Sequence, residues 1–213
     1  MIFEIIAASY PREKFVNPWK GIEENREHPH AHINVLINAM LCQTSDNWKL
    51  TLVSDGDDED TRNIVTLGHP VASMDGTIQY LHTEHTFGDY GHSPREFGLG
   101  HSTGDWIIFT SDDNYYVPTF IEEFTRAAES SEDVGFIYCD MSHDHHDYIP
   151  EKTRLEEQHI DMGCVAVRSD IVKEVGFLSR RMQADWDFIS EIMQKHGNSF
   201  ETKKIDKVLF VHN

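Results

Sequence analysis

The sequence has few basic residues and no apolar run long enough to cross a membrane. Lysine and arginine together number 18, against 37 aspartate and glutamate residues, which gives a formal net charge of -19. This charge repels polyanions, so nucleic acid and an anionic membrane face are disfavoured as partners. The N-terminal apolar run, residues 1–8, is too short for a signal peptide or a membrane span. We therefore expect no membrane anchor.

Cysteine is also scarce. Cys42, Cys139 and Cys164 are odd in number, far apart in the chain, and set in or beside apolar runs. Disulfide-stapled domains need paired cysteines, so we expect three reduced core thiols and a cytoplasmic protein. The 213 residues, 39% of them hydrophobic, are enough for one domain with its own core.

Apolar runs alternate with amphipathic stretches along the chain. The predicted strands cover residues 3–8, 48–53, 78–83, 106–110, 134–141, 164–167 and 208–211. The predicted helices cover residues 33–41, 94–102, 118–128, 169–175 and 185–195. Alternation of this kind is typical of an α/β sandwich, in which helices flank a central, mostly parallel sheet. No repeat or linker divides the chain, so we expect a single domain over residues 1–213.

Two adjacent carboxylates follow the buried strand at residues 106–110. Asp112 and Asp113 should project from the carboxyl end of this strand, where open α/β sheets bind ligands. Oxygen donors in such a crevice suit Mg²⁺ or Mn²⁺. A turn with an Asp helix cap explains the same residues equally well. His212, at the end of the last strand, offers a nitrogen ligand for the same cation, although an isolated histidine is more often a surface residue.

The last predicted helix begins with two further carboxylates, Asp185 and Asp187. Acidic residues stabilise the positive end of the helix dipole, which accounts for both. Either carboxylate is also a candidate general base that takes a proton from a hydroxyl group. Their spacing does not distinguish the two residues.

The run His143-Asp144-His145-His146-Asp147 contains the residue types of a metal site. Adjacent ligands in a loop seldom reach a closed tetrahedral arrangement without cysteine or a spaced second pair. We therefore expect a solvated, flexible loop, which could line an acceptor entrance, rather than a zinc site. Gly98 and Gly100 lack the strand and helix order of a dinucleotide fingerprint, so we assign none.

In their order and spacing, these segments resemble family 2-like glycosyltransferases of the GT-A fold, over nearly the whole chain. The matching segments are Ala8-Ser9-Tyr10, 36–48 with Cys42-Gln43-Thr44, Ser54-Asp55-Gly56-Asp57, Gly104-Asp105-Trp106, Ser111-Asp112-Asp113-Asn114 with Pro118, Asp161-Met162-Gly163-Cys164, and Ala184-Asp185-Trp186. The resemblance implies a Rossmann-like GT-A sandwich that moves a sugar from a nucleotide donor, preferably a UDP-sugar, to a carbohydrate or other hydroxyl acceptor with inversion. Residues 1–115 or so would bind the nucleotide, and the remainder to residue 213 the acceptor.

The resemblance also implies roles for residues on the donor side. Ser9, Tyr10 and Asp55 would shape the nucleoside pocket. Arg95 would contact nucleotide oxygens, for which its planar guanidinium is suited. Asp112 would contact the ribose or a metal-bound water, and the metal ligands would be Asp113 and His212, holding Mn²⁺ or Mg²⁺.

On the acceptor side, the resemblance assigns the catalytic base to Asp185, with Gly163 and Trp186 contacting the acceptor. Three positions depart from the family pattern: Ser111 and Asn114 stand where aspartate is frequent, and Ala184 stands where a glutamate precedes the base. The alternative is therefore a catalytically degenerate protein that binds a nucleotide or carbohydrate. A nucleotidyltransferase would need a glycine-rich basic phosphate loop, which residues 7–11 do not provide.

Overall fold

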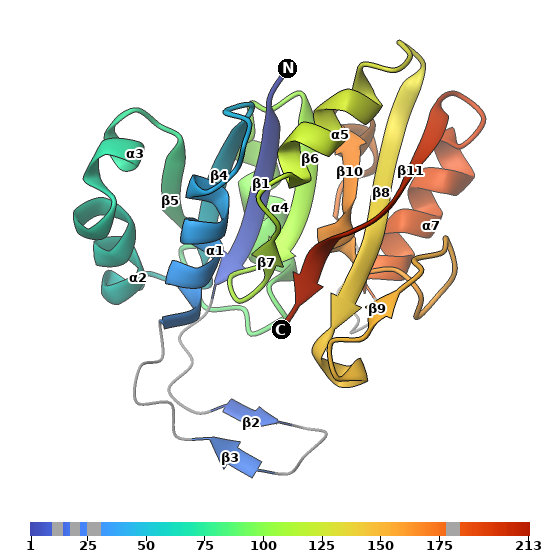
Figure 1. Cartoon of the computed structure of the whole chain (residues 1–213). Coiled ribbons are helices and arrows are strands. Elements are labelled where there is room, and N and C mark those ends of the chain that lie inside the picture. Colours follow the sequence, from blue (N-terminus) through green and yellow to red (C-terminus); the bar gives the residue numbers. More distant parts are fainter. Residues whose placement is uncertain (10–14, 18–21, 25–30, 178–183) are drawn as a thin grey trace.

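A computed structural model describes residues 1–9, 15–17, 22–24, 31–177 and 184–213. A nine-stranded sheet forms its centre, with strand order β5-β4-β1-β6-β10-β8-β11-β7 and β9 beside β8. The strands are β1 (Phe3–Ser9), β4 (Trp48–Ser54), β5 (Ile78–His82), β6 (Trp106–Ser111), β7 (Tyr115–Tyr116), β8 (Val134–His143), β9 (Pro150–Glu151), β10 (Val165–Arg168) and β11 (Glu201–His212). Strands β2 (Phe15–Asn17) and β3 (Ile22–Glu24) form a separate antiparallel pair. Helices lie on both faces of the main sheet, which confirms the predicted α/β sandwich (Figure 1).

The first half of the sheet, β5-β4-β1-β6, is entirely parallel. All seven residues of β1 are buried, because α1 (Ala31–Leu41) covers one face and α4 (His92–His101) the other (Figure 1). Gly98 allows α4 to approach closely, since a Cβ there would lie 2.6 Å from Ile6 Cγ2 and 2.9 Å from Val53 Cγ2. Gly98 is therefore a packing residue.

The second half of the sheet is mixed. Strand β10 is antiparallel to both β6 and β8, whereas β11 is parallel to β8 and antiparallel to the short β7. Helix α5 (Phe120–Ala128) covers one face and α7 (Ala184–His196) the other (Figure 1). Helix α6 (Ser169–Val175) packs against α7, β10 and β6. Three register shifts interrupt the pairing of β11 with β8, yet the two strands end together, with His212 opposite His143.

Strand β11 is much longer than the predicted 208–211. Its first half, Glu201 to Lys207, is polar and gives no apolar signal, but it pairs with β8 through the backbone. An ion pair supports this pairing, since Lys204 of β11 contacts the buried carboxylate of Asp140 on β8 at 3.0 Å; Lys152, just after β9, contacts the same carboxylate at 2.6 Å. The other predicted helices and strands agree with the structure to within two residues at each end.

Three short helices between β4 and β5 were not predicted. They are α2 (Glu59–Asn63), a π-helical turn (Ile64–Gly68) and α3 (Pro70–Met74). Their apolar residues are largely exposed, with Met74 at 89%, so no buried stripe marked them in the sequence. The cysteine prediction was wrong for Cys42, which is exposed, and right for Cys139 and Cys164, which are buried; all three are free thiols.

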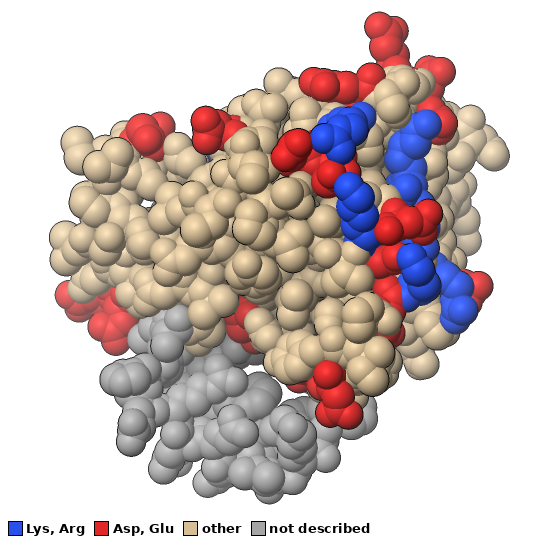
Figure 2. Space-filling view, viewed as in Figure 1, with Lys and Arg blue, Asp and Glu red and all other residues tan. Residues whose placement is uncertain are grey.

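Charged side chains on the face shown in Figure 2 gather over α5, β8 and β11, with both signs interleaved. Lys207 contacts Glu123 at 2.8 Å, and Arg126 contacts Glu123 at 2.9 Å and Glu122 at 3.0 Å. The basic residues of this face are therefore neutralised locally. Within the described parts of the chain, no helix has the length and apolarity to cross a membrane.

Candidate active site

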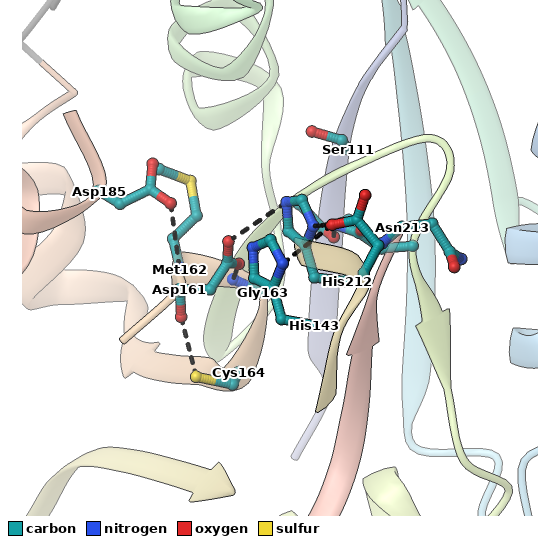
Figure 3. Close-up of polar contacts among 12 residues, drawn as sticks. Ser111, His143, Asp161, Met162, Gly163, Cys164, Asp185, His212 and Asn213 are labelled. Atoms are coloured by element: carbon teal, nitrogen blue, oxygen red, sulfur yellow. Dashed lines mark hydrogen bonds and ion pairs between the residues drawn. The ribbon is translucent and has the colours of Figure 1, made fainter. Parts of the chain in front are cut away.

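A cavity of about 220 Å³ opens at the carboxyl ends of β6 and β11, whose last residues, Ser111 and His212, both line it. Arg95, Asp161 and Asp185 line it as well. Figure 3 shows Asp161 between His212 and Asp185. The cavity thus joins a guanidinium, two carboxylates and an imidazole that come from four separate segments of the chain.

Arg95 extends from α4 and is nearly fully buried. Its Nε donates to the carbonyl of Thr110 at 3.1 Å, Nη1 to the carbonyl of Tyr90 at 3.0 Å, and Nη2 to Ser111 Oγ at 2.9 Å. These three acceptors are neutral, so they fix the guanidinium without cancelling its charge. The predicted anion-contacting role of Arg95 fits this rigid, charged edge of the cavity.

Two of the side chains predicted for the nucleoside pocket, Ser9 and Asp55, lie at the carboxyl ends of β1 and β4. Asp55 is buried just after β4, and its two carboxylate oxygens accept hydrogen bonds from the backbone N–H groups of Phe87 and Gly88, both at 2.8 Å. Asp55 therefore fixes the loop that follows β5. Ser9 Oγ is buried and has no hydrogen-bond partner among the described residues. Tyr10 lies outside the described residues.

Asp112 and Asp113 follow β6 as predicted but differ in environment. Asp112 is fully buried, with Oδ2 3.1 Å from Nε2 of His32 on α1. Asp113 is partly exposed, and its backbone carbonyl accepts a hydrogen bond from Asn213 Nδ2 at 2.7 Å. The end of β11, with His212, is thereby tied to the Asp113 turn. Asp113 itself is not among the described residues that line the cavity.

The two departures beside these aspartates have structural explanations. Ser111 Oγ accepts the hydrogen bond from Arg95. Asn114 uses both ends of its amide, since Nδ2 donates to Thr110 Oγ1 at 3.0 Å and Oδ1 accepts from the Asn213 backbone at 3.2 Å. An ionised aspartate at position 114 could accept a hydrogen bond from Thr110 Oγ1 but, unlike asparagine, could not donate one.

The structure separates the two carboxylates that begin α7. Asp185 lines the cavity, whereas Asp187 is not among the described lining residues. Burial raises the pKa of Asp185 to about 7, and the nearby negative charge of Asp161 adds to this shift. Arg95, a hydrogen bond from the Met162 backbone at 3.4 Å, and His212 act in the opposite direction. A carboxyl group that titrates near neutral pH is suited to general base catalysis.

The two residues predicted to contact the acceptor lie beside the cavity rather than among its described lining residues. Gly163 is buried against the ring of Phe210, and a Cβ at this position would lie 2.4 Å from the ring carbons. Trp186 is half-buried and packs against the hydrophobic core. Gly163 therefore has a packing role that is independent of any acceptor.

Sequence reasoning missed three residues beside His212, namely His143, Asp144 and Asp161. The expected solvated, flexible loop at 143–147 is wrong for the first two, because His143 ends β8 and Asp144 begins a short 3₁₀ helix (Asp144–His146). The rings of His143 and His212 stack with centroids 4.0 Å apart. Burial, assisted by the charge of His212, lowers the pKa of His143 to about 4. Strand pairing created this cluster, and no local pattern marked it.

Oxygen and nitrogen donors near the end of β11 fit a divalent cation. His143, Asp144 and His212 place one donor atom each within 4.8 Å of one another. Asp144 Oδ1 and His212 Nδ1 are buried without a hydrogen-bond partner in the described chain. Buried polar atoms normally have partners, so these two are candidates for metal coordination.

Comparison with known proteins gives matches of three kinds. Residues 27–204 match Glycosyl transferase family 2. An uncharacterized glycosyltransferase from Haemophilus influenzae is 24% identical over 195 residues, which cover 84% of this chain and 63% of that protein. The crystal structure of TarS from S. aureus superposes with a TM-score of 0.73 at 15% identity, covering 100% of this chain and 37% of that chain.

Two ligand complexes are similar as well. TarS 1-349 in complex with UDP-GlcNAc has a TM-score of 0.73 at 15% identity and covers 100% of this chain and 59% of that chain. The mannosyltransferase PcManGT from Pyrobaculum calidifontis, in complex with GDP-Man and Mn²⁺, has a TM-score of 0.65 at 14% identity, with coverages of 98% and 56%. These likenesses confirm the predicted GT-A sandwich. The chain spans less than two thirds of the length of each of these relatives.

Proposed function

The chain belongs to glycosyl transferase family 2, and from this membership we propose that it transfers a sugar from a nucleoside diphosphate donor to a hydroxyl acceptor. The observation that carries the proposal is the cavity in which Arg95, Asp185 and His212 meet. UDP is the preferred nucleotide, because TarS has been solved with UDP and UDP-GlcNAc. GDP is the competing choice, since PcManGT has been solved with GDP-Man.

The donor site proposed here follows the carboxyl ends of β1, β4 and β6. Ser9, Tyr10 and Asp55 hold the nucleoside, and Asp112 holds the ribose or a metal-bound water. Arg95 faces the diphosphate. Its guanidinium is already held by three neutral acceptors, so it can bind an anion without further ordering. The buried Ser9 hydroxyl, which has no partner among the described residues, supports a ligand contact at this position.

Asp113 and His212 hold the cation, Mn²⁺ or Mg²⁺, in this proposal. The hydrogen bond from Asn213 to the Asp113 carbonyl supports it, because this bond keeps the end of β11 against the Asp113 turn. A cation bound there supplies positive charge that stabilises the departing diphosphate. The chain contributes by orienting the two side chains from adjacent segments.

Asp185 is the general base of the proposed reaction. In its ionised form it takes the proton from the acceptor hydroxyl, whose oxygen forms a bond to the anomeric carbon as the bond to the diphosphate breaks. Attack from the face opposite the diphosphate inverts the anomeric configuration. A pKa near 7 leaves a large fraction of Asp185 ionised at neutral pH while keeping it basic enough to accept the proton. Gly163 and Trp186 lie on the acceptor side.

A second candidate is a catalytically degenerate protein that binds a nucleotide or carbohydrate. Ala184 favours it, because this buried residue at the start of α7 leaves no carboxylate directly before Asp185. Ser111 and Asn114 do not favour it, since each has the hydrogen-bonding role described above. The two candidates share nucleotide binding and differ in turnover.

Calorimetric titration of UDP and GDP, with and without Mn²⁺, tests the binding step on wild type and on Asp113→Ala. We expect UDP binding that requires Mn²⁺ and is lost in the variant. Incubation with UDP-sugars, followed by NMR of the released or transferred sugar, then tests turnover and the anomer formed. Binding without turnover would favour the degenerate protein, and a retained anomer would contradict Asp185 as the base of a single displacement.

We also place the protein in the cytoplasm. Its cysteines are free thiols, and burial raises the pKa of Cys139 well above its usual value, which keeps this thiol protonated and unreactive. Fractionation of cells that produce the full-length protein tests this placement, and recovery of the protein outside the cytoplasm would contradict it.

A further inference from the structure

The parallel pairing of β8 with β11 brings two histidines into contact. His143 and His212 are register partners at the ends of these strands, and their rings stack at an interplanar angle of 10°. Neighbouring residues of parallel strands project from the same face of the sheet, which explains the stacking. Figure 3 shows both rings on the same side of the Asp161 carboxylate.

Three lone-pair atoms converge beside this pair. His143 Nδ1 accepts a hydrogen bond from the His145 backbone N–H at 3.1 Å, so this nitrogen carries no proton in that arrangement. The same atom nevertheless lies 2.9 Å from Asp144 Oδ1, and His212 Nδ1 lies 3.6 Å from that oxygen. Two acceptors this close repel each other unless positive charge is placed beside them.

The separations of these atoms match the edges of a coordination polyhedron. Nitrogen and oxygen ligands lie about 2.0–2.2 Å from a transition-metal dication, so two ligands at 90–110° from one another are roughly 2.8–3.6 Å apart. The distances of 2.9 and 3.6 Å lie at the two ends of this range. Small side-chain shifts would complete a three-ligand site, with the His145 bond to His143 given up to the cation.

The environment of His212 also suits a metal ligand. Its second nitrogen, Nε2, faces Asp161 Oδ2 at 3.7 Å, while Nδ1 faces Asp144. Metal-binding histidines commonly direct their other ring N–H to a carboxylate, which fixes the ring and raises its basicity. Asp161 is itself held, since its Oδ1 accepts a hydrogen bond from the Gly163 N–H at 2.6 Å.

We propose that His143, Asp144 and His212 bind a transition-metal dication in the absence of nucleotide, with Asp161 orienting His212. Two imidazoles and one carboxylate favour Mn²⁺, Co²⁺ or Zn²⁺ over Mg²⁺, which prefers oxygen ligands throughout. The inference deepens the proposed function and rests on it in one respect, because His212 is the ligand shared with the donor's cation. His143 and Asp144 add two ligands, and the cation is bound before the sugar nucleotide arrives.

Co²⁺ titration of the metal-stripped full chain tests the site, because coordinated Co²⁺ absorbs visible light with bands that report its ligands. We expect bands that saturate at one equivalent of Co²⁺ and persist in a large excess of Mg²⁺. His143→Ala and the near-isosteric Asp144→Asn should each weaken Co²⁺ binding by at least the ~100-fold that loss of an outer-shell partner can cost. His146→Ala is the matched control, since this exposed residue of the same 3₁₀ helix contacts Glu151.

Absence of the bands, or bands that both ligand variants leave unchanged, would overturn the inference. UDP titration of the same samples separates this result from the proposed function. UDP binding without a Co²⁺ site would remove the inference and leave the transferase proposal standing. A Co²⁺ site with the expected variant effects, in a protein that binds no nucleotide, would support the inference and contradict the transferase proposal. Circular dichroism establishes that each variant is folded.

Discussion

The buried polar side chains of the two halves of the sheet differ in how well their hydrogen bonds and charges are satisfied. In the parallel half, Asp55 accepts two backbone hydrogen bonds and Arg95 donates three, so both groups are fixed before any ligand binds. In the mixed half, Asp185 has a raised pKa, and buried atoms of the ionisable groups of Asp144 and His212 have no hydrogen-bond partner among the described residues, whereas the Ser9 atom that lacks one in the parallel half belongs to a neutral hydroxyl. Buried groups with a shifted pKa or without a hydrogen-bond partner are typical of functional sites. In the proposed reaction, the parallel half would therefore form a preformed binding edge, and the mixed half would carry the reactive groups.

The largest effect should come from the mixed half. Asp185→Asn should lower kcat by about 10²–10⁴-fold, the usual contribution of a general base, without loss of thermal stability at pH 8. Stability should be kept because the ionised carboxylate is itself unfavourable in its buried setting. Asp187→Asn, in the same helical turn, is the control and should retain most activity. A larger loss of kcat in Asp187→Asn than in Asp185→Asn would show that Asp185 is not the base.

A variant in the parallel half should affect binding and stability together. Arg95→Lys keeps the charge but cannot reproduce three hydrogen bonds from one planar group. We expect the Kd for UDP to rise about 10–100-fold, since one hydrogen bond from a charged group contributes about 1.5–3 kcal/mol. Thermal unfolding should also shift downward, because buried carbonyls lose their donor. Arg154→Lys, at an exposed ion pair, is the control. If Arg95→Lys weakened UDP binding without lowering thermal stability, the hydrogen bonds of Arg95 would not be what holds the binding edge in place before UDP binds.

The pH dependence should distinguish the halves as well. Below pH 7, kcat/KM should fall about tenfold per pH unit as Asp185 becomes protonated. Stability should change in the opposite direction, because a raised folded-state pKa gives stability that is complete below pH 4 and is lost as pH rises through 7. This contribution amounts to at most about 4 kcal/mol. Both dependences should be absent in Asp185→Asn, and a wild-type profile that is flat between pH 5 and 7 would exclude Asp185.

The same contrast governs how much could be predicted from sequence. In the parallel half, buried strands are apolar runs and the candidate site residues follow them directly, so Asp55, Asp112 and Asp113 were placed correctly at strand ends. The positions of these residues depend on local sequence only. Arg95, by contrast, was assigned from the family resemblance, and the structure adds the contacts that fix it.

In the mixed half, the site depends on strand pairing that local patterns do not encode. The start of β11 is polar and was not predicted, and its register shifts decide which residue of β8 faces His212. His143 and Asp144 were therefore assigned to a solvated loop. Asp161 lies in a segment that resembles the family, but the sequence assigns it no role, because its proximity to His212 and Asp185 arises only in the folded chain.

The smallest effect expected is a loss of stability in Asp55→Asn. The carboxylate accepts hydrogen bonds from Phe87 and Gly88, and an asparagine must turn its NH₂ group toward one of these N–H donors. An unsatisfied buried donor costs about 1–3 kcal/mol, which lowers the Tm by about 2–4 °C per kcal/mol in a chain of this size. Asp57→Asn, an exposed residue paired with Arg62, should change the Tm much less. Equal shifts in the two variants would mean that Asp55 does not fix the loop, and the preformed edge would then depend on Arg95 alone.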